Sequence, residues 1–381
     1  MSQNLTLSFW IQKKMAKIPD KTEIDFETGK CVETKVNKAA YIAERMKAVQ
    51  NPYTGNKRKL VVDIFDFLDR HGVKGNTFCD LFAGSATVAM AAKYLGYNVI
   101  ANDLMLFPYH NIEAFITHDV ELSEDLLSFF VENEPDEKDM VRVVRDHYAH
   151  RFTEQEALHL DRYRTNIGLH DSINGYQYYD KSMALVQICH YVMENCFLGG
   201  RLNNGQVLAD IYHRLNHDRN KGSTMNFYQV PRYKFKLAHH DKQYYGFNQD
   251  AVDLLKRKDL PNIDICYIDP PYGGQQSDYA KMYAFFEDFC RGYVSEKIEG
   301  SEKFVSTKTY YDYFAELLEV ASKIPVLVFS YNDSSWGDIS KIIKSIERFG
   351  RKVSVEKVDY NYNYRNQERS ATEYLILAEH N

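Results

Sequence analysis

Apolar and polar positions along the chain predict an open α/β sheet. The runs NTFCDLF at 76–82 and YNVIAND at 97–103 are typical of buried strands, and a helix of small residues separates them, so that together they form a β-α-β unit. Further strand-like segments follow at 244–250, 263–269 and 324–333. The alternating segments KVSVEKVDYNYNY and EYLILAE then close the chain as an expected antiparallel pair.

A long stretch between the second and third predicted strands interrupts this sheet. Residues 111–240 are mostly helical or irregular in pattern and contain polar loops such as HDRNKGSTMN. Two amphipathic helices are expected ahead of the first strand, over 37–50 and 61–72. We therefore expect one open α/β sheet that a large insert near 115–240 divides in sequence.

Length and composition are those of a globular protein. The chain has 381 residues, of which 44% are hydrophobic and 14% aromatic, enough for one large domain or two ordinary ones. No apolar run approaches the roughly 20 residues that span a bilayer, and the first residues lack the pattern of a signal peptide. The 6 cysteines are scattered without a CxxC pair, which favours a reduced intracellular protein.

Charge is unevenly distributed along the chain. The net charge of −6 does not by itself indicate nucleic-acid binding. Residues 141–245 nevertheless carry 14 Lys and Arg against 10 Asp and Glu, a net of +4, which leaves −10 for the rest. This Tyr- and His-rich window is consistent with an ordinary surface or with an insert that faces DNA.

The first β-α-β unit carries a candidate nucleoside site. Gly84 ends the first strand with small residues on either side, so a ligand can approach the backbone closely there. Asp103 ends the next strand, 19 residues later, where an acid can accept hydrogen bonds from ribose hydroxyls. Ala86 replaces the third glycine of a dinucleotide loop and no phosphate-binding lysine follows, which favours S-adenosylmethionine over a dinucleotide. The alternative is a plain strand–helix turn with a surface Asp.

The segment IDICYIDPPYGG carries the second candidate site. Its strand must stop at Pro270 and Pro271, because proline has no N–H to donate to a sheet ladder. Asp269 and the Pro270 carbonyl can then form a row of acceptors, with the flat face of Tyr272 beside them. Such a row suits an exocyclic amino group on a planar base, whose lone pair the acceptors can free for attack on a methyl group. The alternative is a Pro-Pro turn after a core strand.

These motifs, in this order, resemble the alpha group of amino-methyltransferases, the DNA adenine methylase-like N6-adenine enzymes. The resemblance covers roughly residues 51–381 and implies a Rossmann-like S-adenosylmethionine-dependent methyltransferase sheet. It implies a catalytic role for the motif DPPY, whose residues are Asp269, Pro270, Pro271 and Tyr272. It also implies cofactor contacts for residues in NPYTGNKRKL, DLFAGSATV, VIAND, GFNQD and DPPY, namely Tyr53, Lys57, Asp80, Phe82, Gly84, Asp103, Asp250 and Asp269.

The same resemblance divides the chain into three parts. Residues 1–50 form an N-terminal extension, residues 51–115 and 241–381 the catalytic domain, and residues 116–240 a mostly helical target-recognition insert. Basic residues of the insert are candidates for contacts with DNA, unless they form ordinary solvated surface: Arg162, Arg164, Arg201, Arg219, Lys221 and Arg232. By the same resemblance, Tyr362 or Tyr364 in the C-terminal motif is expected near the target base, and we select Tyr364.

A metal site is not expected. Cys189, Cys196, His213 and His217 form one candidate grouping, but their spacing is too loose for a standard zinc finger.

The sequence therefore predicts a site-specific DNA methyltransferase that transfers a methyl group from S-adenosylmethionine to N6 of a flipped adenine in double-stranded DNA. We expect a cytoplasmic protein of prokaryotic or phage type, with no membrane contact and with a possible cognate restriction endonuclease as partner. Two alternatives stay open. One is a methyltransferase for RNA N6-adenine or DNA N4-cytosine, and the other is a catalytically silent DNA-binding subunit.

Overall fold

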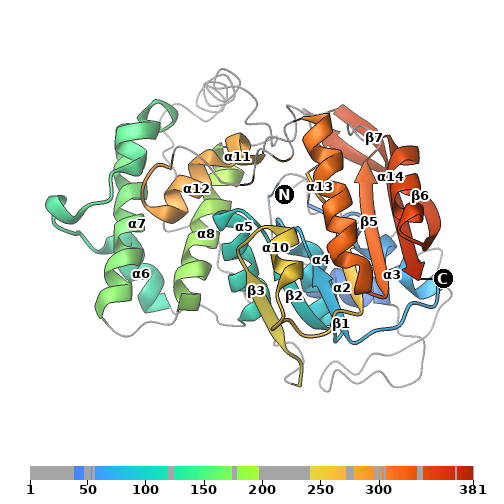
Figure 1. The fold of residues 1–381 in the computed structure, drawn as a ribbon. Helices are drawn as coiled ribbons and strands as arrows, with labels where there is room; N and C mark the ends of the chain where they lie inside the picture. The colour runs from blue at the N-terminus through green and yellow to red at the C-terminus, as the bar shows by residue number, and fades with distance from the viewer. Residues whose placement is uncertain are drawn as a thin grey trace.

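The chain folds around one mixed sheet with helices on both faces and a helical lobe at one side (Figure 1). This description rests on a computed structural model. It describes the following residues: 38–46, 53, 56–118, 124–173, 178–196, 241–271, 279–295, 300, 303, 306–332, 338–364 and 367–380.

The sheet has seven strands in the order β3-β2-β1-β4-β5-β7-β6. The first five in this order pair in parallel, whereas β7 pairs antiparallel with both of its neighbours. The predicted Rossmann-like sheet and its antiparallel closing pair are thus confirmed. The strand bounds are β1 (Thr77–Asp80), β2 (Asn98–Asn102), β3 (Tyr244–Phe247), β4 (Ile265–Ile268), β5 (Val326–Asn332), β6 (Arg351–Tyr364) and β7 (Gln367–His380).

Alternating side chains of the central strands supply two separate hydrophobic cores. Phe78 and Tyr267 lie in the core on one face of the sheet, and Cys79 and Cys266, one residue away on each strand, lie in the core on the other. The first face is covered by α2 (Lys38–Met46), α3 (Val61–Arg70), α4 (Thr87–Tyr94) and the π-helical turn η1 (Glu113–Thr117). The second face is covered by α10 (Ala251–Lys256), α13 (Thr307–Val320), the 3₁₀ turn η8 (Ala321–Lys323) and α14 (Ile339–Arg348).

A third core belongs to the helical lobe. Its buried side chains come from two parts of the sequence, 126–193 and 283–290, together with Tyr53 and the start of α5. The helical elements of the lobe are α5 (Leu106–Ile112), α6 (Glu124–Glu132), η2 (Glu137–Asp139), η3 (Val144–Tyr148), η4 (Ala149–Arg151), α7 (Glu154–Ile173), α8 (Tyr178–Cys196), α11 (Tyr279–Met282) and α12 (Ala284–Arg291). The helices expected for the insert are present over 124–196, and they share a core with α12, which the sequence assigns to the catalytic domain. The three predicted domain boundaries stay a prediction.

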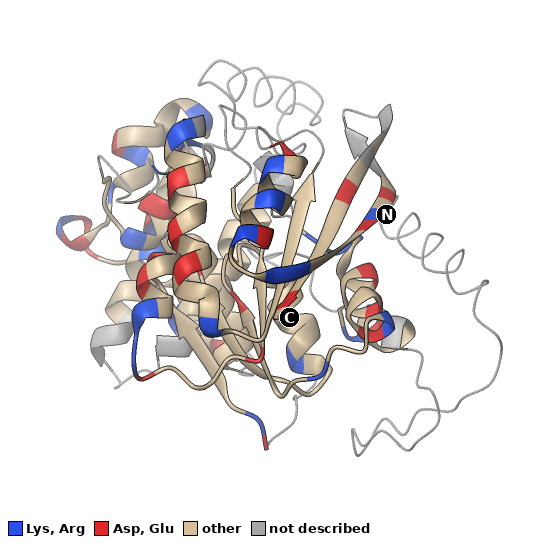
Figure 2. Ribbon diagram, turned by 45° about the vertical axis from the view of Figure 1, so that its right-hand side comes forward, with Lys and Arg blue, Asp and Glu red and all other residues tan. Residues whose placement is uncertain are grey.

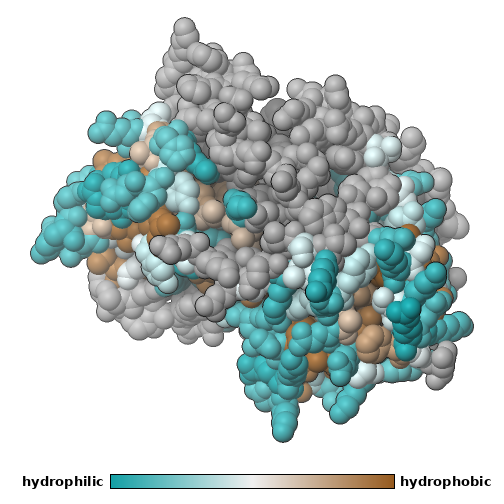
Figure 3. Space-filling view, turned by 45° about the horizontal axis from the view of Figure 1, so that its top comes forward, coloured by the Kyte–Doolittle hydropathy of each residue, from teal (hydrophilic) through white to brown (hydrophobic). Residues whose placement is uncertain are grey.

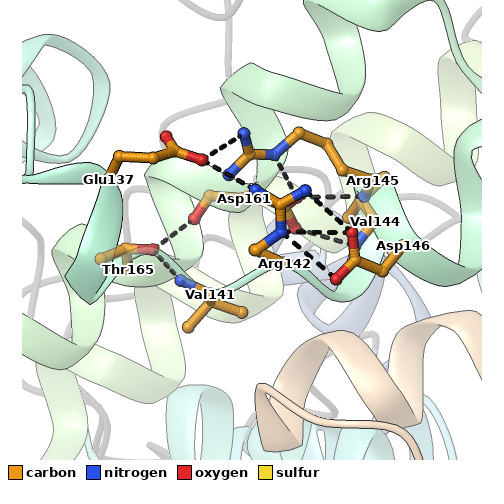
Figure 4. Close-up of polar contacts among 8 residues, drawn as sticks. All are labelled: Glu137, Val141, Arg142, Val144, Arg145, Asp146, Asp161 and Thr165. Atoms are coloured by element: carbon orange, nitrogen blue, oxygen red, sulfur yellow. Dashed lines mark hydrogen bonds and ion pairs between the residues drawn. The ribbon is translucent and has the colours of Figure 1, made fainter.

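A buried carboxylate fixes the segment before α7 (Figure 4). Asp161 of α7 accepts hydrogen bonds from the backbone N–H groups of Val144 at 2.8 Å and Arg145 at 3.0 Å, and from Nε of Arg145 at 3.1 Å. Thr165, one turn further along α7, accepts from the backbone N–H of Val141 at 2.9 Å. These bonds satisfy backbone donors that the irregular segment leaves without helical partners.

The structure corrects the prediction that Arg164 contacts DNA. Its side chain is 7% exposed, and its guanidinium donates to the carbonyl oxygens of Phe289 at 2.8 Å, Cys290 at 3.1 Å and Arg291 at 3.1 Å. These are the last carbonyls of α12, which a cation stabilises because they lack helical partners. Arg164 therefore fastens α12 to α7, and its guanidinium is engaged inside the protein.

The outer surface of the described residues is polar and mixed in charge. Lys and Arg are interspersed with Asp and Glu along the helices (Figure 2). On the face shown in Figure 3, hydrophilic residues form most of the described surface, with smaller apolar areas between them. Within the described residues, no helix is long and apolar enough to cross a membrane.

The roles of two arginines on α7 can be separated by denaturation. Arg164→Ala should lower the free energy of unfolding by about 2–4 kcal/mol, because it removes charged hydrogen bonds and leaves buried carbonyls without donors. Arg162→Ala is the matched control. Arg162 lies 3.3 Å from the exposed Glu134, and the loss of such a pair costs less than about 1 kcal/mol. Urea unfolding of both variants measures the difference, and equal costs would contradict the role given to Arg164.

Candidate active site

The predicted cofactor residues meet in one cavity at the carboxyl ends of the parallel strands. The cavity contains about 1070 Å³ of empty space, counting the part that is open to solvent. Ligands of open α/β sheets bind at this edge, between two neighbouring strands whose connections lead to opposite sides of the sheet. In this protein the two strands are β1 and β4. Pro270 and Pro271 line the cavity. All eight predicted cofactor residues line it too, namely Tyr53, Lys57, Asp80, Phe82, Gly84, Asp103, Asp250 and Asp269. Tyr272 lies outside the described residues.

Asp103 is held in place by the loop after β1. Its carboxylate accepts from the backbone N–H of Gly84 at 2.9 Å and from that of Met105 at 2.9 Å. Burial raises the pKa of Asp103 to about 6, although these hydrogen bonds lower it. Asp103 is therefore ionised at neutral pH, and its lone pairs that remain can accept hydrogen bonds from a ligand in the cavity.

The loop after β1 leaves no room for larger side chains. Gly84 has a φ of +50°, and a Cβ added there would lie 3.3 Å from the Tyr53 ring. Ala86 has a φ of 58° and precedes α4 directly. A left-handed conformation costs an alanine about 1–2 kcal/mol relative to the right-handed one. Ala86 therefore holds a backbone conformation that a glycine would adopt without this cost.

Asp80 is a buried carboxyl group at the end of β1. Its Oδ2 accepts from the backbone N–H of Ala89 at 3.0 Å, whereas Oδ1 has no hydrogen-bond partner among the described residues. Burial and then the charge of Asp269 raise the pKa of Asp80 to about 8. Asp80 is therefore mostly protonated at neutral pH in the ligand-free cavity, and a cation bound beside it would favour its ionised form.

Asp250 forms a second polar edge of the cavity. Its Oδ1 caps α10 by accepting from the backbone N–H of Val252 at 3.0 Å. Its Oδ2 accepts from Lys303 Nζ at 2.9 Å and from the Tyr313 hydroxyl at 3.1 Å. The predicted approach of Asp250 to a cofactor adenine stays a prediction, and the structure adds Lys303 and Tyr313 to its surroundings.

Lys57 joins the predicted cofactor and catalytic residues. Its Nζ lies 2.8 Å from Oε1 of Glu373 and 3.2 Å from Oδ2 of Asp269. Burial by itself lowers the pKa of Lys57, but Asp269 and Glu373 outweigh it and hold that pKa above its ordinary value. Lys57 is therefore a permanent cation at the end of β4. Sequence reasoning missed Glu373, although the motif EYLILAE contains it.

Parallel tyrosine rings form one wall of the cavity. The rings of Tyr53 and Tyr283 stack with centroids 4.5 Å apart and an angle of 7°, and those of Tyr279 and Tyr283 are 6.0 Å apart at 13°. Tyr53 and Tyr279 also line the cavity. The sequence gives one signal for Tyr279, since it opens a helix soon after DPPY.

The other predicted site residues lie elsewhere. Arg162, on α7, forms an ion pair with Glu134, and its contact with DNA stays a prediction. Tyr364 ends β6, and its side chain is outside the described part of the chain. Also outside it lie Arg201, Arg219, Lys221 and Arg232, together with His213 and His217. The described residues contain no group of three or more His, Cys, Asp or Glu side chains that could hold a metal ion.

Comparison with known proteins agrees with the family that the sequence motifs resemble. The family model described as D12 class N6 adenine-specific DNA methyltransferase matches residues 53–299. Type II methyltransferase M2.HphI of Haemophilus parahaemolyticus is 24% identical over 340 residues, which are 86% of this chain and 96% of that protein. Type II methyltransferase M.NlaIII of Neisseria lactamica is 24% identical over 336 residues, 81% of this chain and 92% of that protein.

Solved structures match more weakly. A precorrin-6y C5,15-methyltransferase from Geobacter metallireducens superimposes with a TM-score of 0.31 at 11% identity, covering 86% of this chain and 94% of that one. A putative RNA methyltransferase from Pyrococcus horikoshii gives a TM-score of 0.35 at 10% identity, covering 90% of this chain and 98% of that one.

Asp80 should make the stability of the ligand-free protein fall as the pH rises toward 8. Its pKa of about 8 in the folded protein lies above the ordinary value of 3.8, so its contribution is complete below pH 3.8 and is lost as the pH rises through 8. Asp80→Asn cannot ionise. Its melting temperature should therefore fall less than that of the wild type between pH 6 and pH 9. Asp259→Asn, at an exposed position, is the control and should follow the wild type. Parallel curves for Asp80→Asn and the wild type would contradict this assignment.

Proposed function

Because the chain belongs to the D12 class of N6 adenine-specific DNA methyltransferases, we propose that it transfers a methyl group from S-adenosylmethionine to N6 of an adenine flipped out of duplex DNA. The observation that carries the proposal is the position of Asp269. It follows β4 at the cavity edge, next to Pro270 and Pro271, and shares that cavity with Gly84 and Asp103.

The lining of the cavity fits S-adenosylmethionine. Asp103 offers carboxylate lone pairs to ribose hydroxyls, and Gly84 lets the ring of Tyr53 pack close to the backbone, where a Cβ would crowd it. The buried Oδ1 of Asp80, which has no hydrogen-bond partner among the described residues, suits a neighbouring positive charge. When bound, this cofactor would supply an electrophilic methyl group on a positively charged sulfur.

The end of β4 is suited to activating an amino group. The N6 lone pair of adenine is delocalised into the ring, so the nitrogen is a poor nucleophile. The Asp269 carboxylate and the Pro270 carbonyl can accept its two hydrogens and favour a tetrahedral nitrogen, which frees the lone pair. The ammonium of Lys57 lies 3.2 Å from Oδ2 of Asp269 and helps to hold this carboxyl group at the cavity edge. No strong base is needed before transfer, because the nitrogen loses its proton readily only after it has been methylated.

The biological setting follows from the relatives. Two of them are named as type II methyltransferases, and this chain covers 96% and 92% of their lengths. We therefore infer that the protein is the modification enzyme of a restriction–modification system, with a cognate restriction endonuclease that cleaves the same unmethylated site. The insert 116–240 would then supply the contacts that select this site, with Arg162 among them.

A methyl-transfer assay tests this function. The purified protein, labelled S-adenosylmethionine and duplex DNA should yield N6-methyldeoxyadenosine in digested product, with far less label in RNA of the same sequence. Asp269→Asn should reduce turnover by about 10²–10³-fold, because it removes the charge of the acceptor at the reacting nitrogen. Asp259→Asn makes the same chemical change at an exposed position and should retain full turnover.

Two results would count against the proposal. N4-methyldeoxycytidine as the product would contradict the target base, and undiminished turnover by Asp269→Asn would contradict the mechanism. Failure of the wild type to bind labelled S-adenosylmethionine would instead revive the alternative of a silent DNA-binding subunit.

A further inference from the structure

We propose that Glu373 is a positioning residue for methyl transfer, which acts by sharing the charge of Lys57 and so leaves the Asp269 carboxylate a strong, oriented acceptor. The inference rests on the proposed function, because it concerns the same reacting amino group. Glu373 lies on β7, next to β5 in the sheet (Figure 1). Glu373 is not among the residues that line the cavity, and its contact with Lys57 is the link to Asp269 on which the inference rests.

Glu373 is held more rigidly than an ordinary ion-pair partner. Its side chain is 1% exposed and lies in the sheet opposite Asn332. Oε1 accepts from Lys57 Nζ at 2.8 Å and also from the Ser330 hydroxyl, whereas Oε2 accepts from Nδ2 of Asn332 at 3.3 Å. Since both oxygens are engaged by buried partners, the carboxylate cannot rotate away from Lys57 without losing several hydrogen bonds.

Such an arrangement fixes Lys57 in turn. A lysine ammonium on a four-carbon stem is flexible, and burial disfavours its charge. Glu373 at 2.8 Å holds Nζ at the end of β4, where Asp269 lies 3.2 Å away. The contact with Lys57 thereby orients Asp269, whose side chain is 16% exposed and lines the cavity.

The charge count explains why two carboxylates are present. A single Lys–Asp pair is neutral, and a full positive charge at 3.2 Å would weaken Asp269 as an acceptor. With Glu373 included, the Lys57 ammonium is shared between two carboxyl groups, so less of its positive charge falls on Asp269. Asp269 lines the cavity and can therefore present its carboxyl oxygens to an amino group there.

Glu373→Gln tests the inference because it removes the charge and preserves the shape. We expect kcat to fall at least tenfold, while the dissociation constants for S-adenosylmethionine and for DNA change by less than about twofold. The matched control is Glu379→Gln, the same change on the same strand but outside the cluster, which should keep wild-type kcat. An unchanged kcat for Glu373→Gln would overturn the proposal.

A double substitution distinguishes positioning from a merely structural role. If Glu373 acts through Asp269, Glu373→Gln should have little further effect on kcat in the Asp269→Asn background, so the two losses should be far from additive. Fully additive losses would overturn the proposal.

Ser330→Ala provides a second route if Glu373→Gln does not fold. It removes one hydrogen bond from Glu373 and neither charge nor volume from the cavity. We expect a roughly three- to tenfold loss of kcat with unchanged cofactor binding, and an unchanged kcat would overturn the inference. A failure of this inference can be distinguished from a failure of the proposed function, because the proposed function fails only if the wild type itself does not methylate adenine in DNA.

Discussion

The site depends on a buried ammonium group that two carboxylates share. Lys57 contacts Asp269 at the end of β4 and Glu373 on β7, which is 316 positions away in sequence. A charge at this depth is strongly disfavoured unless it is paired, so the N-terminal motif, the catalytic strand and the C-terminal strand must come together for any of the three groups to be stable. The antiparallel placement of β7 beside β5 is what brings Glu373 to this point.

The cavity beside Lys57 is lined by acidic side chains that differ in protonation and in the ligand groups that they suit. Asp103, fixed by the backbone N–H of Gly84, stays ionised at neutral pH and suits hydroxyl donors. Asp80, which is also buried, is mostly protonated in the ligand-free cavity. Asp269 is paired with Lys57 and lines the cavity. One strand-end cavity can thus offer separate acceptors to a ribose, to a sulfonium and to an exocyclic amine, which are the groups that methyl transfer to adenine brings together.

Much of this arrangement could be predicted from the sequence, because it depends on local patterns. Gly84, Asp103 and Asp269 follow buried strands and so mark the carboxyl edge of a parallel sheet. The other five predicted cofactor residues came from the family resemblance, and they line the same cavity. The role of Glu373 could not be predicted, since it arises from a pairing of distant strands. Arg164 was predicted wrongly for a related reason: composition marks it as basic, but only the packing of α12 on α7 reveals that it is buried.

A crystal structure of the protein with S-adenosylmethionine would test the central claim most directly. The account predicts that the ribose hydroxyls donate to Asp103, that the methyl group points toward the end of β4, and that Lys57 remains between Asp269 and Glu373. A cofactor bound away from Gly84 and Asp103, or a Lys57 that turns from Asp269 to the ligand, would contradict it.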